Sequence, residues 1–149
     1  MKVVFVDVDG PLIPARCYFD GSPKFDDGTW KYDYVAVCML KSLAKNFGIK
    51  IVYNSSHNDL GPEYIRHQAT LNSLLQHLHE DFMTDFPRTT YKREEGIEKW
   101  LQAHPETTHW AAVDDFELAL PNAIKIDFNI GITLNDFEKM KGLLEECKS

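Results

Sequence analysis

The chain has 149 residues, of which 44% are hydrophobic and 26% charged, a composition typical of a globular protein with one core. Its formal net charge of -7 argues against a protein that coats nucleic acid or binds an anionic membrane, because the long-range field repels polyanions. The three cysteines form neither a CxxC pair nor a dense disulfide pattern, which fits a reducing compartment. The N-terminal apolar run is too short for a signal peptide or a membrane span, so we expect one soluble, cytoplasmic domain over residues 1–149.

Short apolar runs alternate with segments of helical periodicity, a pattern typical of an α/β protein with a mostly parallel central sheet. The first run, residues 2–6, is rich in valine and ends at Asp7, so it predicts a buried central strand. Residues 11–30 are rich in glycine, proline and aspartate. They predict a loop or small hairpin over the strand ends, which can act as a flap.

A helix followed by a strand is predicted over residues 32–53. Apolar residues at helical spacing predict a helix over residues 32–47, and Gly48 stands where a helix C-cap is expected. The next strand is predicted over residues 49–53. Its sequence, KIVYNS at residues 50–55, matches the pattern of KVVFVD at residues 2–7. Ser55 therefore occupies the position after the second strand that Asp7 occupies after the first.

The remaining elements continue the alternation. Periodicity predicts one helix or two short ones over residues 63–78 and a helix over residues 93–103. Strands are predicted over residues 82–83, 110–113 and 123–126. Thr133 and Asp136 form a capping-box signature, which predicts a final amphipathic helix.

Polar side chains gather where the predicted strands end. They are Asp7 and Asp9 after the first strand, Ser55 and Ser56 after the second, Asp114 and Asp115 after a later one, and Lys92 before a helix. In open α/β sheets, ligands bind beyond the carboxyl ends of the strands. Several carboxylates at one place cannot all ionise without compensation, which a hard divalent cation and a lysine supply. The pattern therefore favours a Mg²⁺ site.

The segment VVFVDVDGPL at residues 3–12 resembles the opening hhhhDxDGxL motif of the haloacid dehalogenase (HAD) superfamily. A serine closing the second strand, a lysine opening a helix and a late acidic pair follow in the order of that family. The closing stretch, residues 131–136, is similar to a turn of small HAD proteins related to domains found with RNA-repair enzymes. The resemblance covers nearly the whole chain and implies a three-layer Rossmann-like fold with a minimal cap or none.

This resemblance implies a magnesium-dependent phosphatase. Asp7 would act as the nucleophile and form an aspartyl-phosphate. Asp9 would protonate the leaving oxygen and later activate water, and an aspartate at this position favours phosphatase over dehalogenase chemistry.

The resemblance also assigns the binding groups. Mg²⁺ would be held by the Asp7 carboxylate, the Asp9 main-chain carbonyl and Asp114, with Asp115 as a ligand or a support. Phosphate would be bound by Ser55, with Ser56 as the alternative one residue along, and by Lys92.

The sequence departs from the HAD pattern at two places, and the roles of several basic residues and histidines stay open. Pro11 stands where threonine is common, and His57 with Asn58 replaces a common Trp-Arg pair, so substrate contacts there do not transfer. Lys92 lies near Arg88 and Arg93, and a solvated basic helix start is the competing interpretation. His57 either lines the phosphate pocket or is structural, whereas His67, His77 and His79 indicate a solvated face more than a zinc site.

Two functions other than catalysis compete with the phosphatase. One is a phospho-acceptor resembling a response-regulator receiver. In a receiver the acidic pair follows the first strand and the acceptor aspartate a middle strand, whereas in this chain the DxD motif comes first and the acidic pair comes late. The other is a HAD-fold module that binds phosphate and Mg²⁺ without turnover, against which the presence of both Asp7 and Asp9 argues. The short stretches between motifs leave no room for a large cap. We therefore expect an open site or one closed by homo-oligomerisation, with a nucleotide, a nucleic-acid end, a phosphoprotein or another phosphomonoester as substrate.

Overall fold

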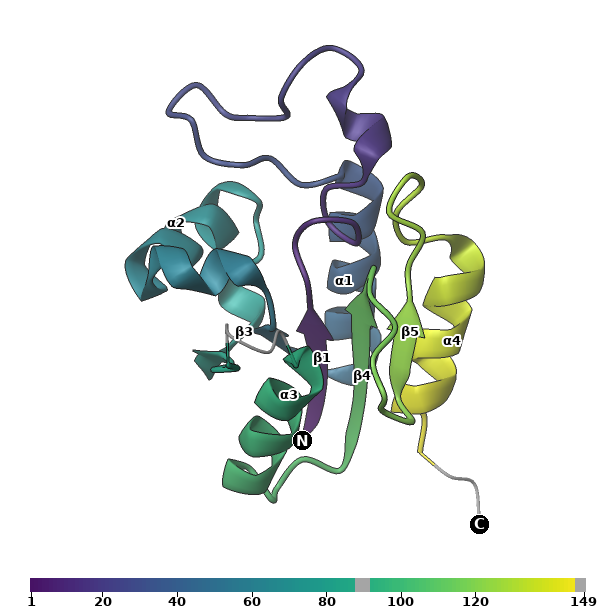
Figure 1. The fold of residues 1–149 in the computed structure, drawn as a ribbon. Helices are drawn as coiled ribbons and strands as arrows, with labels where there is room; N and C mark the ends of the chain where they lie inside the picture. Colours follow the sequence, from purple (N-terminus) through teal and green to yellow (C-terminus); the bar gives the residue numbers. More distant parts are fainter. Residues whose placement is uncertain (88–91, 147–149) are drawn as a thin grey trace.

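The computed structural model describes residues 1–87 and 92–146, which form an α/β fold around a parallel sheet (Figure 1). The strands are β1 (Lys2–Val6), β2 (Lys50–Tyr53), β3 (Leu78–Met83), β4 (His109–Asp114) and β5 (Ala123–Lys125). Their order across the sheet is β3-β2-β1-β4-β5, and every neighbouring pair is parallel. The predicted Rossmann-like α/β fold is confirmed.

Helices cover both faces of this sheet (Figure 1). They are α1 (Tyr34–Phe47), α2 (Pro62–Leu71), α3 (Arg93–Ala103) and α4 (Leu134–Leu144). Within the described ranges, none of them is long and apolar enough to cross a membrane.

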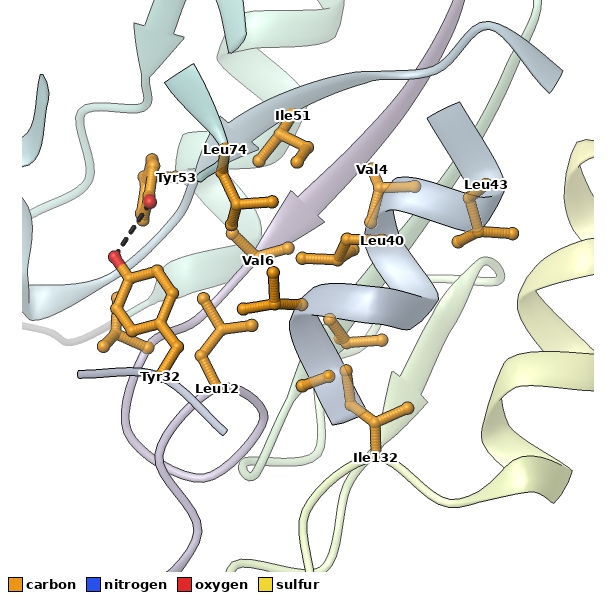
Figure 2. Close-up of a cluster of buried hydrophobic side chains, with 14 of the residues drawn as sticks. Val4, Val6, Leu12, Tyr32, Leu40, Leu43, Ile51, Tyr53, Leu74 and Ile132 are labelled. Atoms are coloured by element: carbon orange, nitrogen blue, oxygen red, sulfur yellow. Dashed lines mark hydrogen bonds between the residues drawn. The ribbon is translucent and has the colours of Figure 1, made fainter. Parts of the chain in front are cut away.

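The two faces of the sheet follow from the alternation of side chains along the central strand β1. Val4 and Val6 point to the face covered by α1, α2 and α4, and they pack in one large apolar cluster with Leu40 (Figure 2). Phe5 points to the opposite face, where it meets Trp100 of α3 edge-on with ring centroids 5.3 Å apart. Burial on both faces explains why the strand is a continuous apolar run.

The predicted helix ends are confirmed in detail. Gly48 has a φ of 68°, and its N–H donates to the carbonyl of Ala44, as in a left-handed C-cap. Thr133 and Asp136 form a reciprocal capping box at the start of α4.

Helix α1 begins two residues later than predicted. Asp33 is its N-cap and accepts a hydrogen bond from the N–H of Ala36 at 3.3 Å. Tyr32 therefore lies outside the helix, and its ring enters the core with the hydroxyl 2.8 Å from that of Tyr53 (Figure 2).

Of the two alternatives predicted for residues 63–78, the structure shows two short helices, α2 and the 3₁₀ helix η3 (Leu75–His77). Ser73 between them has a φ of 61°, in the left-handed region that interrupts helical hydrogen bonding. Strand β3 begins at Leu78 and is longer than the predicted segment at 82–83. It lies at the sheet edge and is largely polar, so the apolar pattern marked only its end.

The segment between β1 and α1 lies beyond the carboxyl end of β1 (Figure 1). It contains the 3₁₀ helix η1 (Ala15–Tyr18) and is attached to the end of α2 through Asn72. The amide of Asn72 donates to the carbonyl of Trp30 at 2.9 Å and accepts from the N–H of Tyr32 at 2.8 Å. The predicted loop over the strand ends is thus anchored on one side.

Candidate active site

The site forms where the central strands end. The N–H of Asp7 donates to the carbonyl of Val113 at 3.1 Å, so the residue just after β1 remains bound to β4. Asp7, Asp114 and Asp115 each offer a carboxylate oxygen, and these oxygens lie within 4.8 Å of one another. The structure therefore brings together the carboxylates that follow β1 and β4 in the sequence.

Asp7 is almost completely buried, with 1% of its surface exposed. Its Oδ1 accepts a hydrogen bond from the N–H of Val8 at 2.9 Å, and its Oδ2 lies 2.7 Å from Nη1 of Arg93. That second contact is an ion pair without a well-directed hydrogen bond, so Oδ2 keeps its acceptor capacity. Burial and the negative charge of Asp114 raise the pKa of Asp7 well above its usual value, although Arg93 opposes this shift.

Arg93 is the cation at these carboxylates. Its Nη1 also lies 3.2 Å and 3.1 Å from the two carboxylate oxygens of Asp114. Its backbone is fixed at the end of β2, because the side-chain amide of Asn54 donates to the Arg93 carbonyl at 3.3 Å. Thr84 in turn donates to Asn54, so the start of α3 is attached to two strand ends.

Lys92, the basic residue singled out in the sequence, lies elsewhere. Its ammonium is 3.8 Å from Glu95, and 58% of its side chain is exposed. While the phosphate contact predicted for Lys92 stays a prediction, the basic residue that contacts the buried carboxylates is Arg93, the next one along. Helical periodicity could have indicated this, because the buried positions Ile97 and Trp100 extend back by one turn to position 93 and not to 92. Arg88, the third residue of the predicted basic group, lies outside the described residues.

The charges of this group fit a divalent cation. Three carboxylates face one buried guanidinium, and burial raises the pKa of Asp114 to about 6 even though Arg93 opposes the shift. Carboxylates held this way are under-compensated and oxygen-rich, which is the donor set that Mg²⁺ prefers. The buried acidic group of Asp7, Asp114 and Asp115 could hold a metal.

Without a metal, the protein is expected to lose stability as the pH rises from about 4 to about 6. In this window folded Asp114 and its neighbour Asp7 retain protons that the unfolded chain has already released, so the free energy of unfolding falls as the pH rises. Thermal unfolding between pH 4 and 8 in EDTA measures this loss, and Mg²⁺ added at pH 7.5 should reverse it. The Asp114→Asn variant should show a flatter pH curve and little response to Mg²⁺, whereas Asp26→Asn, on the exposed loop, should follow the wild type. An unchanged slope in Asp114→Asn would contradict this assignment.

Gly10 is required for the turn that follows these carboxylates. Its φ of 105° is unfavourable for other residues, and a Cβ at this position would lie 2.8 Å from the Cβ of Asp115. The turn therefore passes directly against Asp115. This contact explains why glycine follows Asp9.

Of the two serines after β2, the structure buries Ser55 completely and leaves Ser56 exposed. The Oγ of Ser55 accepts a hydrogen bond from the N–H of His57 at 3.2 Å and caps the 3₁₀ helix η2 (Ser56–Leu60). Its hydroxyl hydrogen remains available to donate to a bound anion. The structure thus distinguishes the two serines by burial, and the phosphate contact of Ser55 stays a prediction.

Asp9 differs from the other carboxylates because 49% of its side chain is exposed. Its Oδ2 lies 3.2 Å from Nε2 of His57, which is buried. The hydrogen bond with His57 lowers the pKa of Asp9, and burial only partly opposes this. The sequence left open whether His57 lines the phosphate pocket or is structural. The structure shows that its ring contacts Asp9, one of the predicted catalytic residues.

A second group of possible ligands lies at the opposite end of the sheet, where β3 starts and α3 ends. His79, His104 and Glu106 offer ligand atoms within 4.8 Å of one another. The two ring nitrogens of His104 already lie 2.8 Å from Asp81 and 3.1 Å from Glu106. This arrangement is explained by ion pairing of His104 with the two carboxylates.

One family model matches most of the chain. The model described as the HAD domain in Swiss Army Knife RNA repair proteins covers residues 3–137. This range contains the four aspartates of the site, Ser55, His57 and Arg93. Comparison with curated proteins and with solved structures gave no match.

Proposed function

Because the chain belongs to the family of HAD domains found in Swiss Army Knife RNA repair proteins, we propose that it is a magnesium-dependent phosphatase. The family indicates hydrolase or phosphatase chemistry in general. The observation that supports this specific reaction is the arrangement of Asp7, buried against Arg93 and Asp114, beside the half-exposed Asp9. One carboxylate can attack while the other exchanges a proton with substrate or water.

In the first step, a carboxylate oxygen of Asp7 attacks phosphorus and the bond from phosphorus to the leaving oxygen breaks. Protonated Asp9 gives its proton to that leaving oxygen, so an alcohol departs and Asp7 carries the phosphoryl group. Asp9 rests as a carboxylate because its pKa is lowered by His57. The negative charge of an incoming phosphate favours its protonation when substrate binds.

In the second step, Asp9 removes a proton from water, and the hydroxide oxygen bonds to phosphorus. The bond to Asp7 breaks, phosphate leaves, and both carboxylates return to their starting states. The charge of the phosphoryl group is balanced by Arg93 and by a hydrogen bond from Ser55. Mg²⁺ would be held by the carboxylates of Asp7 and Asp114 and the main-chain carbonyl of Asp9, with Asp115 close by, and when bound it would supply further positive charge for the phosphoryl oxygens.

We propose a phosphorylated RNA end as the substrate class, as the family description suggests. Beside Asp115 lies a hollow of about 450 Å³ that is also lined by Lys125 and Phe128. Phe128 and Phe116 are 45% and 55% exposed, and exposed aromatic rings of this kind can stack on unpaired bases. The net charge of -7 favours a short single-stranded end over a long duplex.

The test is release of inorganic phosphate from p-nitrophenyl phosphate, from nucleoside monophosphates and from short RNA oligonucleotides phosphorylated at the 3′ or 5′ end. With Mg²⁺, we expect turnover of p-nitrophenyl phosphate and a higher kcat/KM for one of the RNA ends than for the mononucleotides. EDTA should abolish both, and added Mg²⁺ should restore them.

The outcomes separate the competing functions. Turnover limited to mononucleotides or phosphopeptides would contradict the RNA-end proposal and leave the phosphatase standing. Stable labelling of the protein by acetyl phosphate with no phosphate release would indicate the phospho-acceptor. Binding of Mg²⁺ by folded protein without labelling or release would indicate the non-catalytic module.

A further inference from the structure

The orientation of Asp9 has to be set by its neighbours. Its side chain is half exposed, and a carboxylate on a surface samples several rotamers unless another group holds it. Proton transfer to a leaving oxygen needs a defined position within hydrogen-bond reach. A group that restrains Asp9 therefore affects the rate without touching the substrate.

His57 is placed to provide this restraint. Its side chain is 9% exposed, and its Nε2 lies 3.2 Å from Oδ2 of Asp9. The other ring nitrogen, Nδ1, lies 3.3 Å from Nε2 of Gln68, whose side chain is completely buried. Both nitrogens of the ring thus have partners, one on each side.

The chain of contacts continues into the apolar core. Oε1 of Gln68 lies 2.5 Å from the hydroxyl of Tyr32, which lies 2.8 Å from the hydroxyl of Tyr53. Both tyrosines are buried, and Figure 2 shows their hydroxyl pair at the edge of the apolar cluster. Four elements are joined in this way: η2, α2, the segment before α1, and β2.

For a His57 ring that carries one hydrogen, counting donors and acceptors gives the direction of every bond. The carboxylate of Asp9 can only accept, so the hydrogen of the His57 ring is on Nε2 and Nδ1 is an acceptor. Gln68 must then donate from its NH₂ group to Nδ1, which turns its Oε1 toward Tyr32. Tyr32 donates to that oxygen, and Tyr53 therefore donates to Tyr32.

On this basis we propose that His57 is a positioning residue for Asp9, and that the buried Gln68–Tyr32–Tyr53 chain supports the tautomer that His57 needs, through the hydrogen bond that Gln68 donates to Nδ1. The inference rests on the proposed phosphatase function. Oδ2 of Asp9 accepts from His57 whether the carboxyl group is ionised or protonated. Oδ1 thus carries the proton that is given to the leaving oxygen and later taken from water.

The kinetic test compares two substrates of nearly equal size, p-nitrophenyl phosphate and phenyl phosphate. Phenolate is the poorer leaving group and needs the proton of Asp9 more. The His57→Leu variant is expected to lower kcat/KM for phenyl phosphate about 10- to 100-fold and for p-nitrophenyl phosphate less than about 3-fold, because only part of the general-acid contribution is lost. His57→Gln, which keeps an N–H donor, should recover most of the loss.

The structural test uses ¹⁵N-histidine NMR and does not depend on turnover. The His57 ring, identified by the signal missing in His57→Gln, should carry its hydrogen on Nε2 at neutral pH. Gln68→Leu removes the donor to Nδ1, so this variant should show a mixture of tautomers and the same leaving-group dependence as His57→Leu. His67→Leu is the matched control, because His67 also joins α2 to an aspartate of the loop, Asp27, at 2.7 Å, but at the surface.

Each result bears on the proposal in one direction. Equal losses for both substrates in His57→Leu, no loss, or no recovery in His57→Gln would overturn the positioning role. A ring hydrogen on Nδ1 would overturn the hydrogen-bond directions. Wild-type protein that releases no phosphate would refute the proposed function itself, whereas the NMR result would still decide the tautomer.

Discussion

Replacing Asp7 with asparagine is expected to reduce phosphate release by roughly 10⁴-fold or more, to below detection, because loss of a nucleophile costs on this order. The two side chains have nearly the same size, so the substitution keeps the packing while it removes the negative charge that attacks phosphorus, binds Mg²⁺ and pairs with Arg93. Because burial raises the pKa of Asp7, a neutral side chain here should not destabilise the protein. The measurement is phosphate release in Mg²⁺ together with the melting temperature.

The control for this variant is Asp9→Ala, which removes the proton carrier and keeps the nucleophile. Alanine is preferred to asparagine at this position because an asparagine before Gly10 deamidates readily and would restore the aspartate. Asp9→Ala should lower turnover about 10²- to 10⁴-fold and allow the phosphoryl group to accumulate on Asp7, detectable by mass spectrometry after acid quenching. Turnover by well-folded Asp7→Asn at the wild-type rate would contradict the covalent mechanism.

The Arg93→Met variant is expected to lose about 10²- to 10³-fold in kcat/KM, whereas Lys92→Met should stay within about 2-fold of the wild type. Arg93 contacts Asp7 at 2.7 Å and Asp114 at 3.1 Å, and Lys92 pairs with Glu95 at the surface. The two variants remove neighbouring charges of the same sign from one helix start. Their comparison therefore separates a specific contact from a general electrostatic effect.

Removal of Arg93 also leaves buried carboxylates without their cation, so stability has to be followed in parallel. Mg²⁺ should partly restore the melting temperature of Arg93→Met. Arg93→Lys keeps the charge and should keep the fold, with an intermediate loss of activity because an ammonium is more strongly hydrated than a guanidinium and is carried on a flexible stem. A large loss in Lys92→Met with none in Arg93→Met would restore the assignment made from the sequence.

Local signals were sufficient for most of the architecture. The valine-rich run ending at Asp7 predicts a central strand because burial on both faces requires a continuous apolar segment. Gly48 and the Thr133–Asp136 pair mark helix ends through hydrogen bonds made within a few residues, and the structure shows these bonds. Helix boundaries were less well predicted where a side chain makes a contact with a distant part of the chain. Tyr32 lies outside α1, and its hydroxyl contacts that of Tyr53.

The sequence alone determined which polar residues follow which strands, because strand length and motif spacing are local properties. Parallel strands then bring Asp7 to Asp114 and Asp115 with no further information. Only the tertiary structure decided that Arg93 and not Lys92 turns inward, since one residue rotates a helical side chain by about 100° and packing on the sheet selects the face. It also decided that His57 meets Asp9, a contact across 48 residues that depends on a buried glutamine and two tyrosines on separate elements. Contacts of this kind carry no local periodicity, and their energy is realised only when the surrounding core excludes water.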